Sequence, residues 1–507
     1  MISLLLRQHG FNFLNGNIIV FSRLLRLLLN CLLLFKMKPV AIPEKTFIDE
    51  NAIQLLIERN PKPSAKEVDD ILAKAMELKG LDLEDVATLL NISDTENLEK
   101  LYSTAHKIKD EIYGKRLVLF APLYVANYCA NNCLYCGFRI ANSEMERTVL
   151  SIDEVKDEVL AILEQGHKRI LMLMGEDHQK SSLDYFYQAI EAAYSVKDSK
   201  GSQIRRINVE IQSLSEEEFN VLKDIKIGTY TLFQETYHPE TYKIMHPSGR
   251  KANYKWRLYT MDRALANGMH DVGIGALFGL TDYRFEVLSL ITHSKHLEKE
   301  FGFGPHTISI PRIRPASGAP ASMQIPNEVS DENFKKLVGI LRISVPYTGM
   351  ILSTRESAEL RTQLFDMGIS QISAGSKTSP GGYKQAFIDK TDEAQFNLND
   401  CRSSGEIIQS VIKQGYIPSF CTACYRLGRI GQDFMDLAKP GLIKLFCLPN
   451  ALTTLKEYLV DYADEETKQL GEAIIQKELQ DIPSDNIRKT TVKYLDEIVD
   501  GKRDLYF

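Results

Sequence analysis

Short apolar runs alternate with longer amphipathic stretches through the middle of the chain. The runs are rich in β-branched residues, and between them apolar positions recur every three or four residues, which is typical of strands separated by helices. This alternation predicts a parallel sheet. Eight similar units over roughly 260 residues favour a closed (β/α)8 barrel of the TIM type over an open, doubly wound sheet. The predicted strands are 117–125, 169–174, 207–212, 229–234, 271–277, 307–312, 349–353 and 371–374.

The pattern changes on both sides of the barrel, which is predicted over 116–386. Residues 44–115 have helical spacing throughout, and Ser64 with Glu67 forms the sequence signature of a capping box. Beyond the barrel the strand–helix alternation stops. We therefore expect 387–507 to form a mainly helical C-terminal domain that docks on the barrel.

Residues 1–43 differ from the rest, because they are rich in Leu and contain Arg but no Asp or Glu. The uncharged run 8–22 is too short to span a bilayer. Three interpretations stay open: an organelle presequence, a membrane-associating helix, or sequence upstream of a true start at Met37, which we favour. We expect a cytoplasmic protein, or an organelle-matrix protein if the presequence is real, without stable membrane insertion.

Composition narrows the class of protein. Charged residues make up 25% and apolar residues 44% of the 507, with a net charge of −6, as in an ordinary globular protein of two or three domains. There is no basic stripe, so no nucleic-acid partner is expected. The cysteines are clustered rather than spread along the chain, which indicates metal ligands in a reducing, oxygen-poor interior and not a disulfide framework.

Six of the eight cysteines form two sets of three, and each set is one ligand short of a closed four-ligand site. The first triad, with C-x3-C-x2-C spacing directly after the first predicted strand, is Cys129, Cys133 and Cys136. The second triad, with C-x2-C-x22-C spacing, is Cys421, Cys424 and Cys447. Three thiolates leave one iron of a four-iron cluster open, so two triads predict two clusters that act on bound molecules. Zinc with a distant fourth ligand stays the alternative for the second triad.

Further candidates lie at the strand ends, where barrel enzymes place their sites. Glu210 shares a strand face with Gln212, and a carboxylate inside a barrel needs either an ion-pair partner or a ligand. Gly273 and Gly275 would let a ligand approach the backbone, although a tight turn explains either one equally well.

Arginines end two of the predicted strands. Arg312 and Arg355 suit carboxylate groups, because guanidinium binds carboxylates with two parallel hydrogen bonds. The glycine-rich segment 373–382 lacks the spacing of a Walker phosphate loop.

The first triad, followed by Gly137 and Phe138, resembles the cluster motif of the radical S-adenosylmethionine (SAM) superfamily. In that superfamily the open iron holds SAM, and an electron from the cluster releases a 5'-deoxyadenosyl radical. The resemblance implies a cofactor-binding set at the strand ends, consisting of Gly175, Glu176, Glu210, Gln234, Gly273, Gly275 and Arg312.

The runs FQETYH, HPSG, GIGALFGL, PRIRPA, LSTRES and AGSKTSPGGY resemble the tyrosine lyases of that superfamily over roughly residues 45–460. The second triad resembles the HydG family of FeFe-hydrogenase maturases. The resemblance implies cleavage of the Cα–Cβ bond of L-tyrosine to p-cresol and dehydroglycine. It also implies conversion of dehydroglycine to carbon monoxide and cyanide, which leave as an iron synthon for the hydrogenase active site. The nearest alternative is a ThiH-like 2-iminoacetate synthase for thiazole synthesis, and a non-catalytic iron–sulfur or zinc scaffold is another.

The same resemblance implies the cofactors and partners. It implies two [4Fe–4S] clusters and SAM, with a fifth iron on the second cluster bridged through L-cysteine and held by one histidine. We expect that histidine to be His296, then His293, with His306 as a third candidate. Arg355, with Ser353 nearby, is expected to bind the carboxylate of tyrosine. The expected partners are an electron donor such as ferredoxin or flavodoxin and the maturases HydE and HydF.

Overall fold

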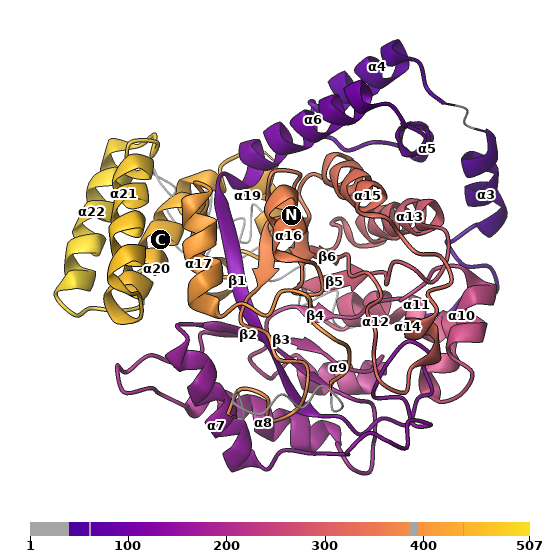
Figure 1. Cartoon of the computed structure of the whole chain (residues 1–507), viewed down its shortest axis with the longest axis horizontal. Coiled ribbons are helices and arrows are strands. Elements are labelled where there is room, and N and C mark those ends of the chain that lie inside the picture. The colour runs from indigo at the N-terminus through magenta and orange to yellow at the C-terminus, as the bar shows by residue number, and fades with distance from the viewer. Residues whose placement is uncertain (1–39, 60–61, 385–393, 440) are drawn as a thin grey trace, which may run out of the picture. The chain divides into compact units, whose positions relative to one another are not determined.

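A closed parallel barrel dominates the computed structural model, which describes residues 40–59, 62–384, 394–439 and 441–507 (Figure 1). Eight strands close the barrel in chain order, and a ninth extends the sheet beside β1. The strands are β1 (Arg116–Ala126), β2 (Arg169–Met174), β3 (Arg206–Glu210), β4 (Tyr230–Thr231), β5 (Val272–Gly275), β6 (Thr307–Ser309), β7 (Gly349–Leu352), β8 (Gln371–Ser373) and β9 (Ile417–Ser419). The predicted (β/α)8 fold is confirmed, and each predicted strand overlaps an observed one.

Strand β1 is the longest element of the sheet and pairs with three others. Its first residues pair with β9, its middle with β8, and five of its last six residues with β2 across an irregularity after Tyr124, all in parallel. β9 was not predicted, because it is only three residues long and contains Pro418, which cannot donate to a strand ladder. This strand carries the chain to the second triad.

Helices cover the barrel and precede it. Before the barrel lie α3 (Glu50–Arg59), α4 (Ala65–Ala75), α5 (Leu83–Leu90) and α6 (Thr95–Tyr113). Between the strands lie α7 (Ile152–Glu164), α8 (Leu183–Ser195), α9 (Glu216–Leu222), α10 (Pro239–Met245), α11 (Tyr254–Leu258), α12 (Thr260–Ala266), α13 (Tyr283–Phe301), α14 (Pro320–Met323), α15 (Asp331–Ser344) and α16 (Ala358–Phe365), with a short 3-10 turn at Arg250–Ala252. The capping box of α4 is present as predicted: Ser64 and Glu67 bond reciprocally.

The segment after the barrel is mainly helical. It comprises α17 (Ser404–Lys413), α18 (Ala423–Arg426), α19 (Gly431–Ala438), α20 (Lys444–Asp461), α21 (Glu465–Leu479) and α22 (Asp485–Val499). Helices α20, α21 and α22 lie side by side at one end of the picture (Figure 1). Residues 42–507 form one compact unit. The predicted domain boundary after residue 386 and most of the predicted extension 1–43 lie outside the described residues.

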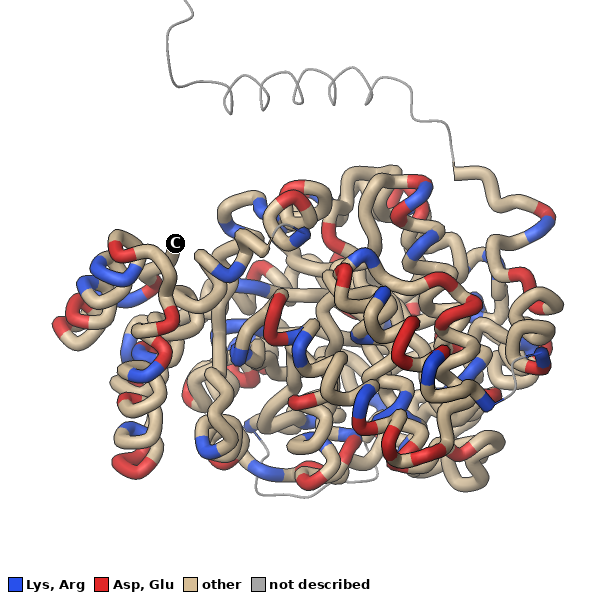
Figure 2. The backbone as a smooth tube through the Cα atoms, turned by 90° about the horizontal axis from the view of Figure 1, so that it is seen from above, with Lys and Arg blue, Asp and Glu red and all other residues tan. Residues whose placement is uncertain are grey.

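The surface and the barrel interior differ in character. Acidic and basic residues are interspersed along the described chain (Figure 2). No helix among the described residues has the length and apolar character needed to cross a membrane. Inside the barrel, alternate residues of neighbouring strands, such as Asn208, Thr231 and Ser309, line a cavity of about 810 Å³, here called the barrel cavity. The small and polar side chains at these positions leave the interior of the barrel partly unfilled. The cavities that the two cysteine triads line adjoin this interior.

Candidate active site and second cysteine site

The first triad lies in the loop after β1 and lines a cavity of about 910 Å³ at the carboxyl ends of the strands, here called the first-triad cavity. Burial raises the pKa of Cys133 to about 11 and that of Cys136 to about 12. Free thiols here therefore keep their protons at neutral pH, and a metal must displace them to bind thiolates.

Gly175 and Glu176 hold the triad loop against the end of β2, and both line the first-triad cavity. The Asn131 amide donates to Glu176 Oε2 at 2.6 Å and lies 3.7 Å from Cys129 Sγ. A Cβ on Gly175 would collide with the carbonyl oxygen of Tyr128. Only glycine permits this close approach, which forms a cradle beside the cysteines.

A buried charged trio in the same cavity was not predicted. Glu235 accepts a hydrogen bond from Lys251 at 2.6 Å, and Arg257 lies 3.5 Å from the same oxygen. Burial favours the neutral acid, but the charges of Lys251 and Arg257 outweigh it and hold the pKa of Glu235 below its ordinary value. Glu235 has a left-handed backbone with φ of 72°, which is rare for a residue other than glycine and frequent at functional sites.

The unusual backbone of Glu235 turns that side chain, and not its neighbour, toward the cavity. Gln234, the predicted cofactor contact, is buried and does not line the cavities described here. Its Nε2 has no hydrogen-bond partner in the described part of the chain. A conformation of this kind leaves no signal in the sequence pattern.

Glu210 stands in the wall shared by the first-triad cavity and the barrel cavity. Burial, reinforced by the charge of Glu235, raises the pKa of Glu210 to about 7. Within the described ranges it forms no ion pair of 4 Å or less. Of the two roles left open by the sequence, the geometry favours contact with a ligand.

Arg355 and Ser353 both line the barrel cavity, and Arg355 also lines the first-triad cavity. The guanidinium lies 3.3 Å from the ring centroid of Phe396 and donates to the backbone carbonyl of Arg312 at 3.4 Å. Burial lowers the pKa of Arg355, and no carboxylate among the described residues forms an ion pair with it. A buried cation of this kind is ready to receive a carboxylate from a ligand.

Arg312, which the sequence predicts as a cofactor contact, is paired with two carboxylates of the chain itself. Its guanidinium pairs with Glu356, with Nε at 3.1 Å from both carboxylate oxygens, and with Asp331 at 2.8 Å. It does not line the cavities described here. The two arginines differ because the loop after β6 directs Arg312 toward α15.

Gly273 and Gly275 make room for neighbouring strands. A Cβ on Gly273 would press on the hydroxyls of Thr307 and Thr231, and one on Gly275 would press on the ring of Phe233. Neither glycine lines the first-triad cavity or the barrel cavity. Their contribution is to strand packing.

The second triad lines a separate cavity of about 540 Å³ at the amino ends of the strands, here called the second-triad cavity. Cys421 follows β9, Cys424 lies in α18, and Cys447 lies in α20. Burial raises the pKa of Cys424 to about 12. Gln371, at the start of β8, lines both this cavity and the barrel cavity, so the two adjoin there.

Cationic side chains surround the second triad. Arg116 and Arg169, at the starts of β1 and β2, line its cavity, and the Nε atom of each is buried without a hydrogen-bond partner among the described residues. Burial works to lower the pKa of Arg116, but the charges of Cys447 and Cys421 raise it above its ordinary value. This surplus of positive charge suits three thiolates and an anionic cluster.

The structure separates the three histidines predicted as candidates for the fifth iron. His293 donates to or accepts from the Tyr237 hydroxyl at 2.8 Å, and His296 contacts Asp262 at 2.7 Å. Both lie on α13, and neither lines the second-triad cavity. His306, the third candidate, lines it and contacts the Tyr425 hydroxyl through Nε2 at 2.7 Å. The sequence placed His293 and His296 in a helical stretch after the fifth predicted strand and His306 at the start of the sixth, and of these three it is His306 that reaches the amino end of the barrel.

Among the described residues, no group of three or more His, Cys, Asp or Glu side chains is arranged to hold a single metal ion, and the two cysteine triads are therefore considered as ligands of clusters.

Comparison with known proteins identifies which family has this fold. Residues 123–290 match the family model described as the Radical SAM superfamily, and residues 309–417 match the Biotin and Thiamin Synthesis associated domain. The chain is 31% identical over 362 residues to the 2-iminoacetate synthase of Escherichia coli (strain K12), a match that covers 71% of this chain and 92% of that protein.

Two solved structures agree with this chain over most of its length. The crystal structure of HydG, a maturase of the [FeFe]-hydrogenase, is 48% identical with a TM-score of 0.87 and covers 91% of this chain and 100% of the other. The X-ray structure of the FeFe-hydrogenase maturase HydG from Carboxydothermus hydrogenoformans is 40% identical with a TM-score of 0.76 and covers 89% and 100%.

The barrel and the matched family model define a radical SAM enzyme, and more narrowly a radical SAM lyase. Its fold implies SAM and one [4Fe–4S] cluster as cofactors. The chain belongs to the HydG family, so the resemblance drawn from the sequence is confirmed.

Replacing Gly175 with alanine should abolish loading of the first site. The added Cβ meets a backbone oxygen of the triad loop, which cannot move aside as a flexible side chain would. We expect iron bound by the first triad and SAM cleavage to fall at least tenfold, measured by iron analysis and 5'-deoxyadenosine formation. The matched control is Gly405→Ala in α17, where only the Tyr458 hydroxyl lies within 4 Å of the new Cβ. Full iron content in Gly175→Ala would contradict the claim that the first triad needs glycine at this position to bind iron.

Glu210→Gln should make the iron-free protein more stable at alkaline pH. Because the folded-state pKa is about 7 and the ordinary value is 4.5, the unfolded state releases this proton first as pH rises. Wild-type stability therefore falls between about pH 4.5 and 7, and the variant lacks this loss. The thermal midpoint of Glu210→Gln should exceed that of the wild type most at pH 8, and the two midpoints should coincide near pH 4. Glu191→Gln, at an exposed position, serves as the control. If the thermal midpoint of Glu210→Gln depends on pH as that of the wild type does, the pKa of Glu210 is not raised.

Proposed function

We propose that this protein cleaves L-tyrosine at the first site and converts the two-carbon product to carbon monoxide and cyanide at the second. The products leave as an iron–carbonyl–cyanide synthon for assembly of the FeFe-hydrogenase active site. The observation that carries the proposal is a run of three adjoining cavities with a cysteine triad at each end.

At the first site, Cys129, Cys133 and Cys136 would hold a [4Fe–4S] cluster, and Glu176 and Glu235 are placed to meet SAM. The Gly175 cradle and the buried charges of the first-triad cavity support the fit of both groups. When bound, they supply the 5'-deoxyadenosyl radical that takes a hydrogen atom from the amino group of tyrosine.

Arg355 and Ser353 would bind the substrate carboxylate in the barrel cavity. Arg355 reaches both cavities, so a carboxylate on it places the adjoining amino group near the first site. Apolar side chains in the same cavity, including Phe120, Leu171 and Leu173, suit the aromatic ring. Glu210 lies between the two cavities and holds or releases a proton near pH 7, as the formation of p-cresol from the ring fragment requires.

Dehydroglycine would move through the barrel to the second site. It is small and carries a carboxylate, and the polar residues that line the barrel cavity lead to Gln371, where the second-triad cavity begins. Arg116 and Arg169 would attract the carboxylate there. This internal path keeps a labile imine away from water.

At the second site, Cys421, Cys424 and Cys447 would hold the other cluster, and His306, which lines the same cavity, would hold a fifth iron. Bound L-cysteine would bridge that iron to the cluster, as the resemblance implies. When bound, this group supplies the iron on which carbon monoxide and cyanide are captured. The two cationic strand starts beside the triad, Arg116 and Arg169, favour anionic groups in this cavity.

The 2-iminoacetate synthase of E. coli suggests a second candidate function, a tyrosine lyase that releases its two-carbon product for thiazole synthesis. The second-triad cavity favours the first proposal, because a lyase of the other kind has no use for a second site. The proposed partners are a low-potential electron donor such as ferredoxin or flavodoxin and the maturases HydE and HydF.

Arg355→Gln should weaken tyrosine binding selectively. Loss of a buried charged hydrogen bond costs about 3 kcal/mol, so we expect the KM for tyrosine to rise roughly 100-fold. SAM cleavage without tyrosine should stay within twofold of wild type. Arg284→Gln, which breaks a surface pair with Asp282, is the control. A KM within threefold of wild type would exclude Arg355 as the carboxylate ligand.

Cys424→Ala tests the division of labour between the two sites. The anaerobically reconstituted variant, given tyrosine, SAM and a strong reductant, should form p-cresol within twofold of wild type and no carbon monoxide or cyanide. Cys401→Ala, which removes an exposed thiol, should change none of the three products. If wild-type protein forms p-cresol but no carbon monoxide, the ThiH-like function replaces the proposal.

A further inference from the structure

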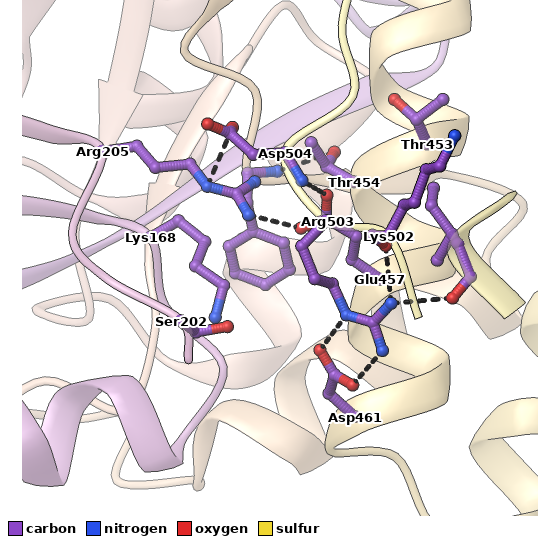
Figure 3. Close-up of polar contacts among 12 residues, drawn as sticks. Lys168, Ser202, Arg205, Thr453, Thr454, Glu457, Asp461, Lys502, Arg503 and Asp504 are labelled. Atoms are coloured by element: carbon purple, nitrogen blue, oxygen red, sulfur yellow. Dashed lines mark hydrogen bonds and ion pairs between the residues drawn. The ribbon is translucent and has the colours of Figure 1, made fainter. Parts of the chain in front are cut away.

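The residues after α22 return to α20, the helix that carries Cys447, and Figure 3 shows Arg503 and Asp504 beside Glu457 and Asp461 of that helix. We call residues 502–507 the tail clamp. Asp504 is its centre: its carboxylate lies 3.1 Å from Arg205 Nε, and its backbone N–H donates to Glu457 Oε1 at 2.5 Å. Arg205 also pairs with Glu457 at 2.7 Å, while Arg503 forms two hydrogen bonds with Asp461. The tail clamp is therefore joined both to the start of β3 and to α20.

The same carboxylate reaches the turn that holds Cys424. Arg426 donates to both Asp504 oxygens, at 2.6 and 2.7 Å, and its guanidinium lies 4.2 Å from the ring centroid of Tyr506. Arg426 is two residues after Cys424, in α18. One aspartate thus links the barrel rim to the cysteine-bearing turn.

The tail clamp also contacts the helix that holds Cys447. The backbone N–H of Phe507 donates to Asn450 Oδ1 at 2.9 Å, and Asn450 is three residues after Cys447. Arg429 donates to the Phe507 carbonyl at 3.2 Å. Both cysteine-bearing elements of the second site therefore meet the same six residues.

Helix α18 depends on such contacts, because it has only four residues and no side-chain cap. A single helical turn is not stable by itself. Tyr425 fixes the cavity side of the turn through His306, and Arg426 fixes its outer side through Asp504. Without the outer contact, the turn would keep its cavity side and the contact of Arg429, which bonds to the Cys424 carbonyl and packs on Phe446 of α20.

The backbone of Asp504 indicates that its position is imposed. Its φ is 64°, in the left-handed region that residues other than glycine adopt only rarely, Asp and Asn more often than the rest. Such a conformation persists only where surrounding contacts determine it, and here those contacts are the charged groups of Arg205, Arg426 and Glu457.

We propose that the tail clamp holds Cys421 and Cys424 in register with Cys447, and that Asp504 is a positioning residue for the second cluster. The inference deepens the second site of the proposed function, but the arrangement of the thiols exists before any metal binds. It can therefore be tested on the iron-free chain, independently of whether carbon monoxide forms.

The test is Asp504→Asn in the full-length, iron-free protein. Asparagine tolerates the left-handed backbone, so the variant removes the charge and leaves the turn geometry available. The alkylation rate of each cysteine by iodoacetamide is followed by mass spectrometry. We expect Cys421 and Cys424 to react roughly fivefold faster, because the turn opens more often. The rates of Cys133 and Cys447 should stay unchanged.

Matched variants complete the test. Asp485→Asn breaks an exposed pair with Arg488 elsewhere in the same helical segment and should change no rate. Arg426→Gln should reproduce the effect of Asp504→Asn, and the double variant should add nothing further. Unchanged rates at Cys421 and Cys424 would overturn the proposal. So would an equal increase at Cys133, because it would show general loosening of the fold.

A second readout uses the reconstituted protein. Asp504→Asn should bind less iron at the second triad while the signal of the first cluster stays intact, as judged by iron analysis and electron paramagnetic resonance. p-Cresol formation should stay at the wild-type rate. Equal loss of both clusters would contradict a role confined to the second site.

Discussion

The barrel interior must stay partly hollow, and both sites depend on this constraint. Barrels of this class generally fill their centre with layers of branched side chains. Here small polar residues such as Asn208, Thr231 and Ser309 stand among the apolar side chains that face inward, and further apolar residues pack under the helices on the outer face of the sheet. Strand β1 runs along the whole interior: Arg116 at its start lines the second-triad cavity, and Tyr124 near its end lines the first-triad cavity. At about 3.3 Å per residue these two positions are roughly 26 Å apart.

Ionisable groups without an ion-pair partner among the described residues mark the first-triad end of this interior. Arg355 is a buried cation that no carboxylate of the described chain neutralises, and Glu210 keeps its proton up to about pH 7. Burying each of these groups without a partner lowers the free energy of unfolding, compared with an apolar side chain at the same position. Ligands that bring the missing charge, such as an amino-acid carboxylate, recover this cost on binding. The strained backbone of Glu235 belongs to the same pattern of stability given up at a functional site.

Sequence periodicity was sufficient to predict the barrel fold, because helical stretches separate its eight strands along the chain. It was also sufficient to bring Arg355 to the cavities, since a strand end fixes which rim a residue occupies. It failed where tertiary contacts decide. His293 and His296 occur close to β6 in the sequence, but α13 carries them away from the second triad, whereas His306 reaches it. Glu235 was missed because one left-handed residue reverses which side chain faces inward, and β9 was missed because it is short and contains a proline.

The most direct test of a two-site enzyme with an internal path is a label-dilution experiment. Reconstituted protein is given tyrosine with carbon-13 in the two carbons of the glycine fragment, together with a large excess of unlabelled glyoxylate and ammonium, which form the same imine in solution. The account predicts that carbon monoxide and cyanide carry undiluted label, because the imine never leaves the barrel. Label diluted in proportion to the external pool would show that the fragment is released and recaptured, and would contradict the internal path.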